Sequence, residues 1–212
     1  MSVVELLRPA MAAALLAAIV SPAADAFTVT VRQGNRMLYL QVGTGTVLFP
    51  RPDEPVPADN STVDRVSITV PAAAVTDGTP LPMTGNSTTT VSPQSQNPIC
   101  PAATDVFIGG LLRVPGNGNN NRTATLNVST ALPLAAGTST IPFTEIEWDS
   151  VGINDSSPTV ASGSFAGTAN QVLATINDGT WFEGCLRFRF RNTQPYPAGD
   201  FTGTAVYTLT AP

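Results

Sequence analysis

The segment from Trp181 to Arg191 constrains the fold most strongly, because apolar and polar side chains alternate along it. Successive side chains of a β-strand point to opposite faces, so this alternation predicts a strand with one face in the core. Burying the four apolar side chains would stabilise the fold by about 6–12 kcal/mol before the entropy cost, whereas the arginines must stay solvated or ion-paired. The apolar face carries Phe182, Leu186, Phe188 and Phe190, and the other carries Trp181, Glu183, Cys185, Arg187, Arg189 and Arg191.

The rest of the chain repeats this pattern in shorter runs, which end at glycine, proline or asparagine. Threonine and valine are abundant, and no long apolar run follows residue 26. Many short strands between turn residues are typical of an all-β protein, and the spacing predicts one antiparallel β-sandwich of about eight to ten strands. The expected strands, besides 181–191 and the two ends of the chain, are 36–42, 63–70, 105–114, 123–132, 141–148, 159–165 and 171–176.

Two turns are expected from their residues. Asparagine and glycine tolerate positive φ, so the segment 117–121 predicts a hairpin that pairs 106–114 with 123–132. The sequence Asn177-Asp-Gly179 predicts a second turn, which leads into the strand from Trp181. The proline-rich segment 49–57 is expected to be an extended loop, since proline cannot donate to a sheet.

Residues 1–26 have the pattern of a secretory signal peptide. Arg8 precedes an apolar run at 9–20, and Ala24-Asp-Ala26 is a typical cleavage site. The run is shorter than the roughly 20 residues that cross a bilayer. We therefore expect an exported chain that begins at Phe27 and forms one domain, residues 27–212, in the periplasm, at the cell surface or outside a bacterial cell.

The chain has two cysteines, Cys100 and Cys185. An even, minimal number of cysteines in an exported protein predicts a disulfide. This bond would close a loop of about 85 residues, for which chain entropy predicts a stabilisation of roughly 4–5 kcal/mol.

The residue types that the chain lacks restrict the classes of function that it can have. The chain contains no histidine and no lysine, and its formal net charge is −5. Histidine is the commonest general base and metal ligand, and nucleic-acid binding requires basic clusters. No cofactor motif is present. We therefore expect a protein that is not an enzyme, holds no cofactor and binds no nucleic acid.

Acidic residues alternate with apolar ones at 145–149, just as arginines alternate with apolar residues at 187–191. Glu145, Glu147 and Asp149 share one face, opposite Ile146 and Trp148. We predict that this strand and 181–191 share an outer sheet face, where exposed ion pairs contribute about 0.2–1 kcal/mol each. A hydrolase that uses Glu145 and Glu147 is a distant alternative, since glycosidases use paired carboxylates.

A second acidic group lies in and after the proline-rich segment. A solvated loop is the expected reading, and a Ca²⁺ site is the alternative because Ca²⁺ prefers several oxygen ligands. The group consists of Asp53, Glu54, Asp59, Asn60 and Asp64.

The last residues alternate again, which predicts a half-buried terminal strand over 199–210. Thr202, Thr204, Thr208 and Thr210 share the opposite face. Pro197 to Thr210 resembles the closing strand of spore coat protein U-like domains and chaperone–usher pilus subunits, which end in a Pro-Ala-Gly-aromatic turn and an alternating strand. In pilins a glycine lies at the distance from the end that Gly199 has here. The apolar face of the strand carries Phe201, Ala205, Tyr207 and Leu209.

The resemblance implies an incomplete Ig-like sandwich. In such subunits a periplasmic chaperone, and then the N-terminal extension of the next subunit, supplies a missing strand. Here Phe27, Val29 and Val31 would be the donor side chains, and the groove beside the terminal strand would accept them. The implied function is an exported structural or adhesive subunit, of fimbrial or coat type, that self-associates by strand addition.

A self-complete secreted sandwich that binds carbohydrate is the alternative. Trp181 and Tyr196 are the aromatic side chains expected to contact such a glycan, because aromatic rings offer an apolar face and a polar edge.

Overall fold

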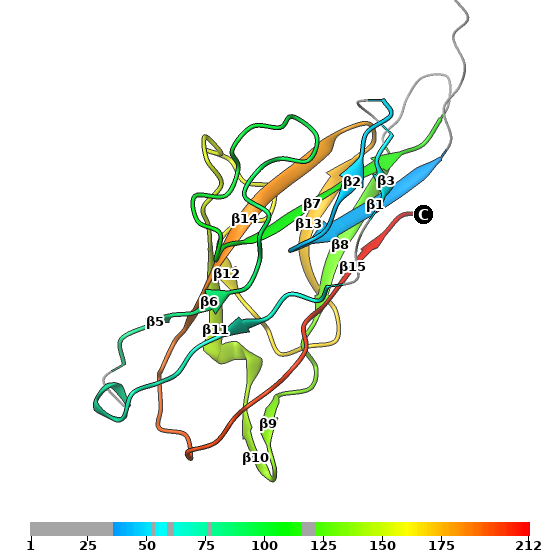
Figure 1. Ribbon diagram of the computed structural model, residues 1–212. Helices are drawn as coiled ribbons and strands as arrows, with labels where there is room; N and C mark the ends of the chain where they lie inside the picture. The colour runs from blue at the N-terminus through cyan, green and yellow to red at the C-terminus, as the bar shows by residue number, and fades with distance from the viewer. Residues whose placement is uncertain (1–35, 52–53, 59–61, 76–77, 116–121) are drawn as a thin grey trace, which may run out of the picture. The chain divides into compact units, whose positions relative to one another are not determined.

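The computed structural model describes residues 36–51, 54–58, 62–75, 78–115 and 122–212, all within one unit, Gln33–Pro212 (Figure 1). The expected signal peptide and the turn at 117–121 lie outside the described residues. So do the predicted donor side chains Phe27, Val29 and Val31, and Asp53, Asp59 and Asn60 of the acidic group.

The fold is all-β, and its largest sheet is antiparallel, with the strand order β1-β7-β14-β11-β12 and β5 paired to β14. The ten-residue strand β14 lies inside this six-stranded sheet, as its long alternation predicts. The strands are β1 (Met37–Val42), β5 (Leu81–Pro82), β7 (Val106–Arg113), β11 (Ile146–Ser150), β12 (Gly163–Ser164) and β14 (Trp181–Phe190).

A second, three-stranded sheet has the order β13-β8-β15 and is also antiparallel. It consists of β8 (Thr123–Ser129), β13 (Gln171–Asn177) and β15 (Val206–Thr210). Along β8 every second side chain is buried, which is the pattern of a strand with one face in the core.

The main core lies between the inner faces of these two sheets, as a β-sandwich requires. Leu112 of β7 and Leu186 of β14 meet Leu126 of β8 in one cluster of buried side chains. Phe165 stacks on Phe188 with the ring centroids 6.0 Å apart. The face of the six-stranded sheet turned away from this core is called the outer face below.

The remaining elements are short. Figure 1 shows the β9–β10 hairpin extending from one end of the sheets, next to the segment that leads to β15. The elements are β2 (Val47–Leu48) with β3 (Val56–Pro57), β4 (Val66–Ser67) with β6 (Thr84–Gly85), β9 (Leu134–Ala136) with β10 (Ser139–Ile141), and the 3₁₀ helices η1 (Ala72–Ala74) and η2 (Phe143–Glu145).

The predicted hairpin between β7 and β8 is wrong, because the two strands belong to different sheets. β7 is buried along both faces and hydrogen-bonds to β1 on one side and to β14 on the other. Both of its edges are therefore occupied, and β8 pairs instead with β13 and β15.

Several predicted strands are shorter than expected or interrupted. The strand at 63–70 is reduced to β4, which pairs with β6, and Val63 is 88% exposed. The strand at 159–165 is reduced to β12, while Val160 and Phe165 fill the core. The strand at 141–148 is interrupted by η2, because Pro142 has no N–H for a ladder.

Candidate functional site

The terminal strand β15 and the strand β1 are both sheet edges. β15 pairs with β8 only, and β1 pairs with β7 only, among the described residues. The two strands lie next to each other (Figure 1), yet no ladder between described residues joins them. Each edge therefore presents main-chain donors and acceptors that a further strand could take up.

The side chains of β15 alternate as predicted. Leu209 is buried and Tyr207 is half-buried against the main core, while Thr208 and Thr210 are exposed. Burial raises the pKa of the Tyr207 phenol well above its usual range. The side of β15 that points into the core is therefore apolar, and the side that points to solvent carries the hydroxyl groups of Thr208 and Thr210.

The strand is shorter than the sequence predicts, because it begins at Val206 instead of near Gly199. Thr202 makes an isolated bridge to Ala135 of β9. Gly203 packs so closely on the Phe143 ring that a Cβ there would lie 2.9 Å from a ring carbon. Phe201 is consequently held beside the β9–β10 hairpin, apart from the edge formed by β15.

Ala205 precedes β15 and is half-buried against the main core. Of the four predicted acceptor residues, Ala205, Tyr207 and Leu209 are therefore brought together, and Phe201 is not.

The facing edge, β1, is also apolar on its inner side. Leu40 and Val42 pack against the main core, and Leu38 remains 44% exposed. The guanidinium of Arg36 donates to the main-chain oxygen of Pro212, which holds the start of β1 to the residues after β15. Sequence reasoning missed β1 as a border of this site, because nothing in 37–42 distinguishes an edge strand from a central one.

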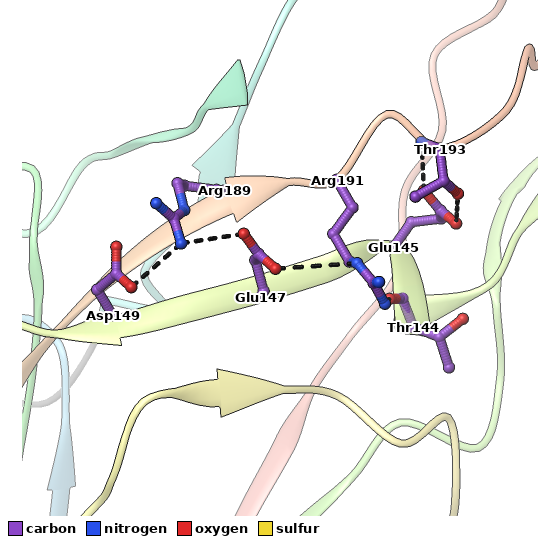
Figure 2. Close-up of polar contacts among 7 residues, drawn as sticks. All are labelled: Thr144, Glu145, Glu147, Asp149, Arg189, Arg191 and Thr193. Atoms are coloured by element: carbon purple, nitrogen blue, oxygen red, sulfur yellow. Dashed lines mark hydrogen bonds and ion pairs between the residues drawn. The ribbon is translucent and has the colours of Figure 1, made fainter. Parts of the chain in front are cut away.

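The outer face of the six-stranded sheet carries the predicted ion pairs (Figure 2). Glu147 is opposite Arg189 and Asp149 is opposite Arg187 in the β11–β14 register. The Arg189 guanidinium lies 3.0 Å from Glu147 and 3.1 Å from Asp149, and Arg191 lies 3.8 Å from Glu147. The prediction that the two charged strands pair on one face is confirmed.

Two members of this set find partners that the alternation does not predict. Arg187 binds the buried Asp105, and the hydrogen bond to Asp105 raises the pKa of Arg187. Glu145 is buried and accepts hydrogen bonds from the Thr193 N–H at 3.2 Å and the Thr193 hydroxyl at 2.5 Å (Figure 2). Glu147 is ion-paired with Arg189 and Arg191. Neighbouring groups therefore bind both carboxylates, Glu145 and Glu147, that the hydrolase alternative requires.

Trp181 belongs to an aromatic cluster at the start of β14. Its ring stacks on Tyr39 with centroids 6.0 Å apart and meets the Phe49 ring edge-on at 5.2 Å. Its Nε1 donates to Glu183 at 2.7 Å, and burial raises the pKa of Tyr39 to about 12. Other side chains of the protein thus engage both the face and the polar edge of the indole.

Tyr196 lies beyond the other end of β14. It packs against Phe190, its hydroxyl accepts a hydrogen bond from Gln194, and burial raises its pKa. The structure therefore does not bring Trp181 and Tyr196 together into one ligand-contacting surface.

The predicted disulfide between Cys100 and Cys185 is confirmed, with the two Cα atoms 5.4 Å apart. Both cysteines are buried with Ile99 and Phe107 in a second small cluster on the outer face. The bond attaches the long connection before β7 to the middle of β14. Disulfides of this kind persist in oxidising compartments.

The described residues contain no group of three or more carboxylate, histidine or cysteine side chains placed to hold a metal ion. Within the acidic group, the Asp64 carboxylate accepts the Thr44 N–H at 2.6 Å. No helix in the described part of the chain is long and apolar enough to span a membrane.

A scan against protein-family models and searches of curated proteins and of solved structures find no match to this chain.

Proposed function

We propose that this chain is an exported structural or adhesive surface subunit, of fimbrial or coat type, that assembles by β-strand addition. The observation that carries the proposal is the pair of adjoining sheet edges, β1 and β15. Their inner side chains are apolar and incompletely covered: Leu38 is 44% exposed and Tyr207 is half-buried.

A strand added at these edges gains two kinds of interaction. Its main chain bonds to the edge groups of β15 or β1, and its inward side chains cover the apolar groups between them. Each such side chain contributes about 1.5–3 kcal/mol when fully buried, less the cost of association.

The segment Phe27–Val31 suits this role, because Phe27, Val29 and Val31 alternate with two threonines. In assembly the segment comes from a second copy of the chain, and before assembly a periplasmic chaperone supplies an equivalent strand. The disulfide supports export, since it is typical of oxidising compartments.

Electrophoresis in SDS without boiling tests this proposal. The chain from Phe27 onward is purified at high concentration, with or without an excess of a synthetic peptide of residues 27–32. Strand addition predicts a ladder of oligomers that the peptide suppresses. A peptide with aspartate in place of Val29 and Val31 is the matched control and leaves the ladder unchanged. A chain that stays monomeric at all concentrations contradicts the proposal.

A further inference from the structure

A hollow of about 440 Å³ opens on the outer face, away from the edges of β1 and β15. Two turns line it: the first runs from Ser92 to Asn97, and the second contains Ile153 and Asn154. Glu183 of β14 also lines the hollow. Its volume falls within the range of about 300–1,000 Å³ that is usual for small-molecule sites.

The walls of the hollow are fixed by contacts among themselves and with β14. The Ser92 N–H donates to the Asn97 carbonyl at 2.8 Å, which closes the first turn. The Ile153 N–H donates to the Ile99 carbonyl at 2.8 Å and joins the second turn to the residues that follow the first. The disulfide from Cys185 to Cys100 anchors the segment just after the first turn to β14. A site held this way loses little conformational entropy when it binds a ligand.

The Glu183 carboxylate is held in one orientation by hydrogen bonds to one of its oxygens, and the other oxygen remains able to accept a hydrogen bond. One carboxylate oxygen accepts the Ser92 hydroxyl at 2.7 Å and the Trp181 indole N–H at 2.7 Å. The other oxygen accepts no hydrogen bond from the described residues. An ionised carboxylate accepts hydrogen bonds at both oxygens, so the second oxygen can accept from a ligand.

The neighbouring groups are neutral and can both donate and accept. Asn97 and Asn154 are exposed, and their side-chain amides make no hydrogen bond with the described residues. Each amide has two N–H donors and an acceptor oxygen. Ile99 and Ile153 add apolar surface to the same lining.

These groups favour a neutral ligand that is rich in hydroxyls. A hydroxyl donates to Glu183, others exchange hydrogen bonds with Asn97 and Asn154, and C–H groups of the ligand lie against Ile153. Ca²⁺ takes six to eight oxygen ligands, whereas Glu183 is the one charged group among the described residues that line the hollow. We propose that the hollow is a binding site for a neutral saccharide unit. The proposal is independent of strand addition, because the hollow and the β1–β15 edges share no residue.

A glycan array probed with the chain from Phe27 onward tests the site, followed by calorimetry with the best neutral oligosaccharide. Asn97→Ala, Asn154→Ala and Glu183→Gln should each weaken binding about tenfold, which corresponds to about 1.4 kcal/mol. Thr175→Ala, an exposed change on β13 in the other sheet, is the matched control and leaves affinity unchanged. Melting temperatures of all variants verify that the fold is intact.

Three results would overturn the site. They are the absence of saturable binding to any neutral glycan, affinity that neither asparagine substitution lowers, and binding that requires added Ca²⁺. The outcome is separable from that of strand addition, because the oligomer ladder of Asn97→Ala and Asn154→Ala should match that of the unchanged chain.

Discussion

Arg187 donates two hydrogen bonds of 2.9 Å to the two carboxylate oxygens of Asp105, whose side chain is only 1% exposed. Asp105 also accepts the Ala102 N–H at 3.1 Å, just after the disulfide cysteine Cys100. This contact therefore joins the start of β7, the end of the long connection and the middle of β14.

Removing Arg187 should destabilise the protein strongly. Arg187→Ala leaves the Asp105 carboxylate buried without its charged partner. Because the Arg187 side chain is itself 43% exposed, we expect a loss of about 1–3 kcal/mol, the cost of leaving a buried acceptor unsatisfied. Arg189→Ala, two residues along the same strand, removes a pair with partly exposed partners and should cost about 0.2–1 kcal/mol. Urea unfolding of both variants measures the difference, and equal losses would contradict this account.

The disulfide should contribute a large share of the stability. Cys100 and Cys185 are 85 residues apart in sequence, and closing such a loop stabilises by about 4–5 kcal/mol. The double substitution Cys100→Ser and Cys185→Ser should lower the free energy of unfolding by about this amount. Urea titration of the variant and of the unchanged chain gives the value. A loss below 1 kcal/mol would show that the connection is held by other contacts.

Gly110 should be required where β1 meets β7. A Cβ at this position would lie 2.4 Å from the Tyr39 carbonyl oxygen, which belongs to the backbone and cannot move independently. Gly110→Ala should therefore cost about 1–3 kcal/mol. Gly184→Ala on β14 is the matched control, because a Cβ there meets only an Asp155 oxygen at 3.9 Å. Thermal unfolding should show a lower melting temperature for the first variant and little change for the second.

All three tyrosines should ionise at a higher pH in the folded protein than in the unfolded chain. Burial raises the pKa of Tyr39 to about 12, and the pKa values of Tyr196 and Tyr207 are also raised. The unfolded chain loses phenol protons near pH 10 while the folded chain retains them, so stability should fall as the pH rises above about 10. Phenolate absorbance during an alkaline titration should rise above pH 10 in buffer and near pH 10 in denaturant. Coincident curves would contradict the burial of these rings.

Local patterns predicted the parts of the fold that depend on one strand at a time. The alternation in 181–191 correctly assigned Phe188 to the core and Arg189 to the outer face. The mirrored charges also predicted the β11–β14 pairing. Each of these inferences rests on the two-residue period of a strand, which the sequence displays directly.

Features that depend on tertiary neighbours were missed. The partner of Arg187 lies 82 residues away in sequence, and no local pattern connects it to Asp105. The terminal strand begins at Val206, opposite Ser129 at the end of its partner β8, although its alternation extends to Gly199. The turn residues at 117–121 predicted that β7 pairs with β8 in a hairpin, whereas β1 and β14 occupy both edges of β7.

Amide hydrogen exchange on β1 and β15 tests strand addition most directly, comparing the monomer with the oligomers of the chain from Phe27 onward. We predict that amides of Met37–Val42 or Val206–Thr210 that lack a partner in β7 or β8 exchange quickly in the monomer. In the oligomers the same amides should exchange at least tenfold more slowly, while those of β8 are unchanged. Equal protection of both edges in the monomer and the oligomers would contradict the account.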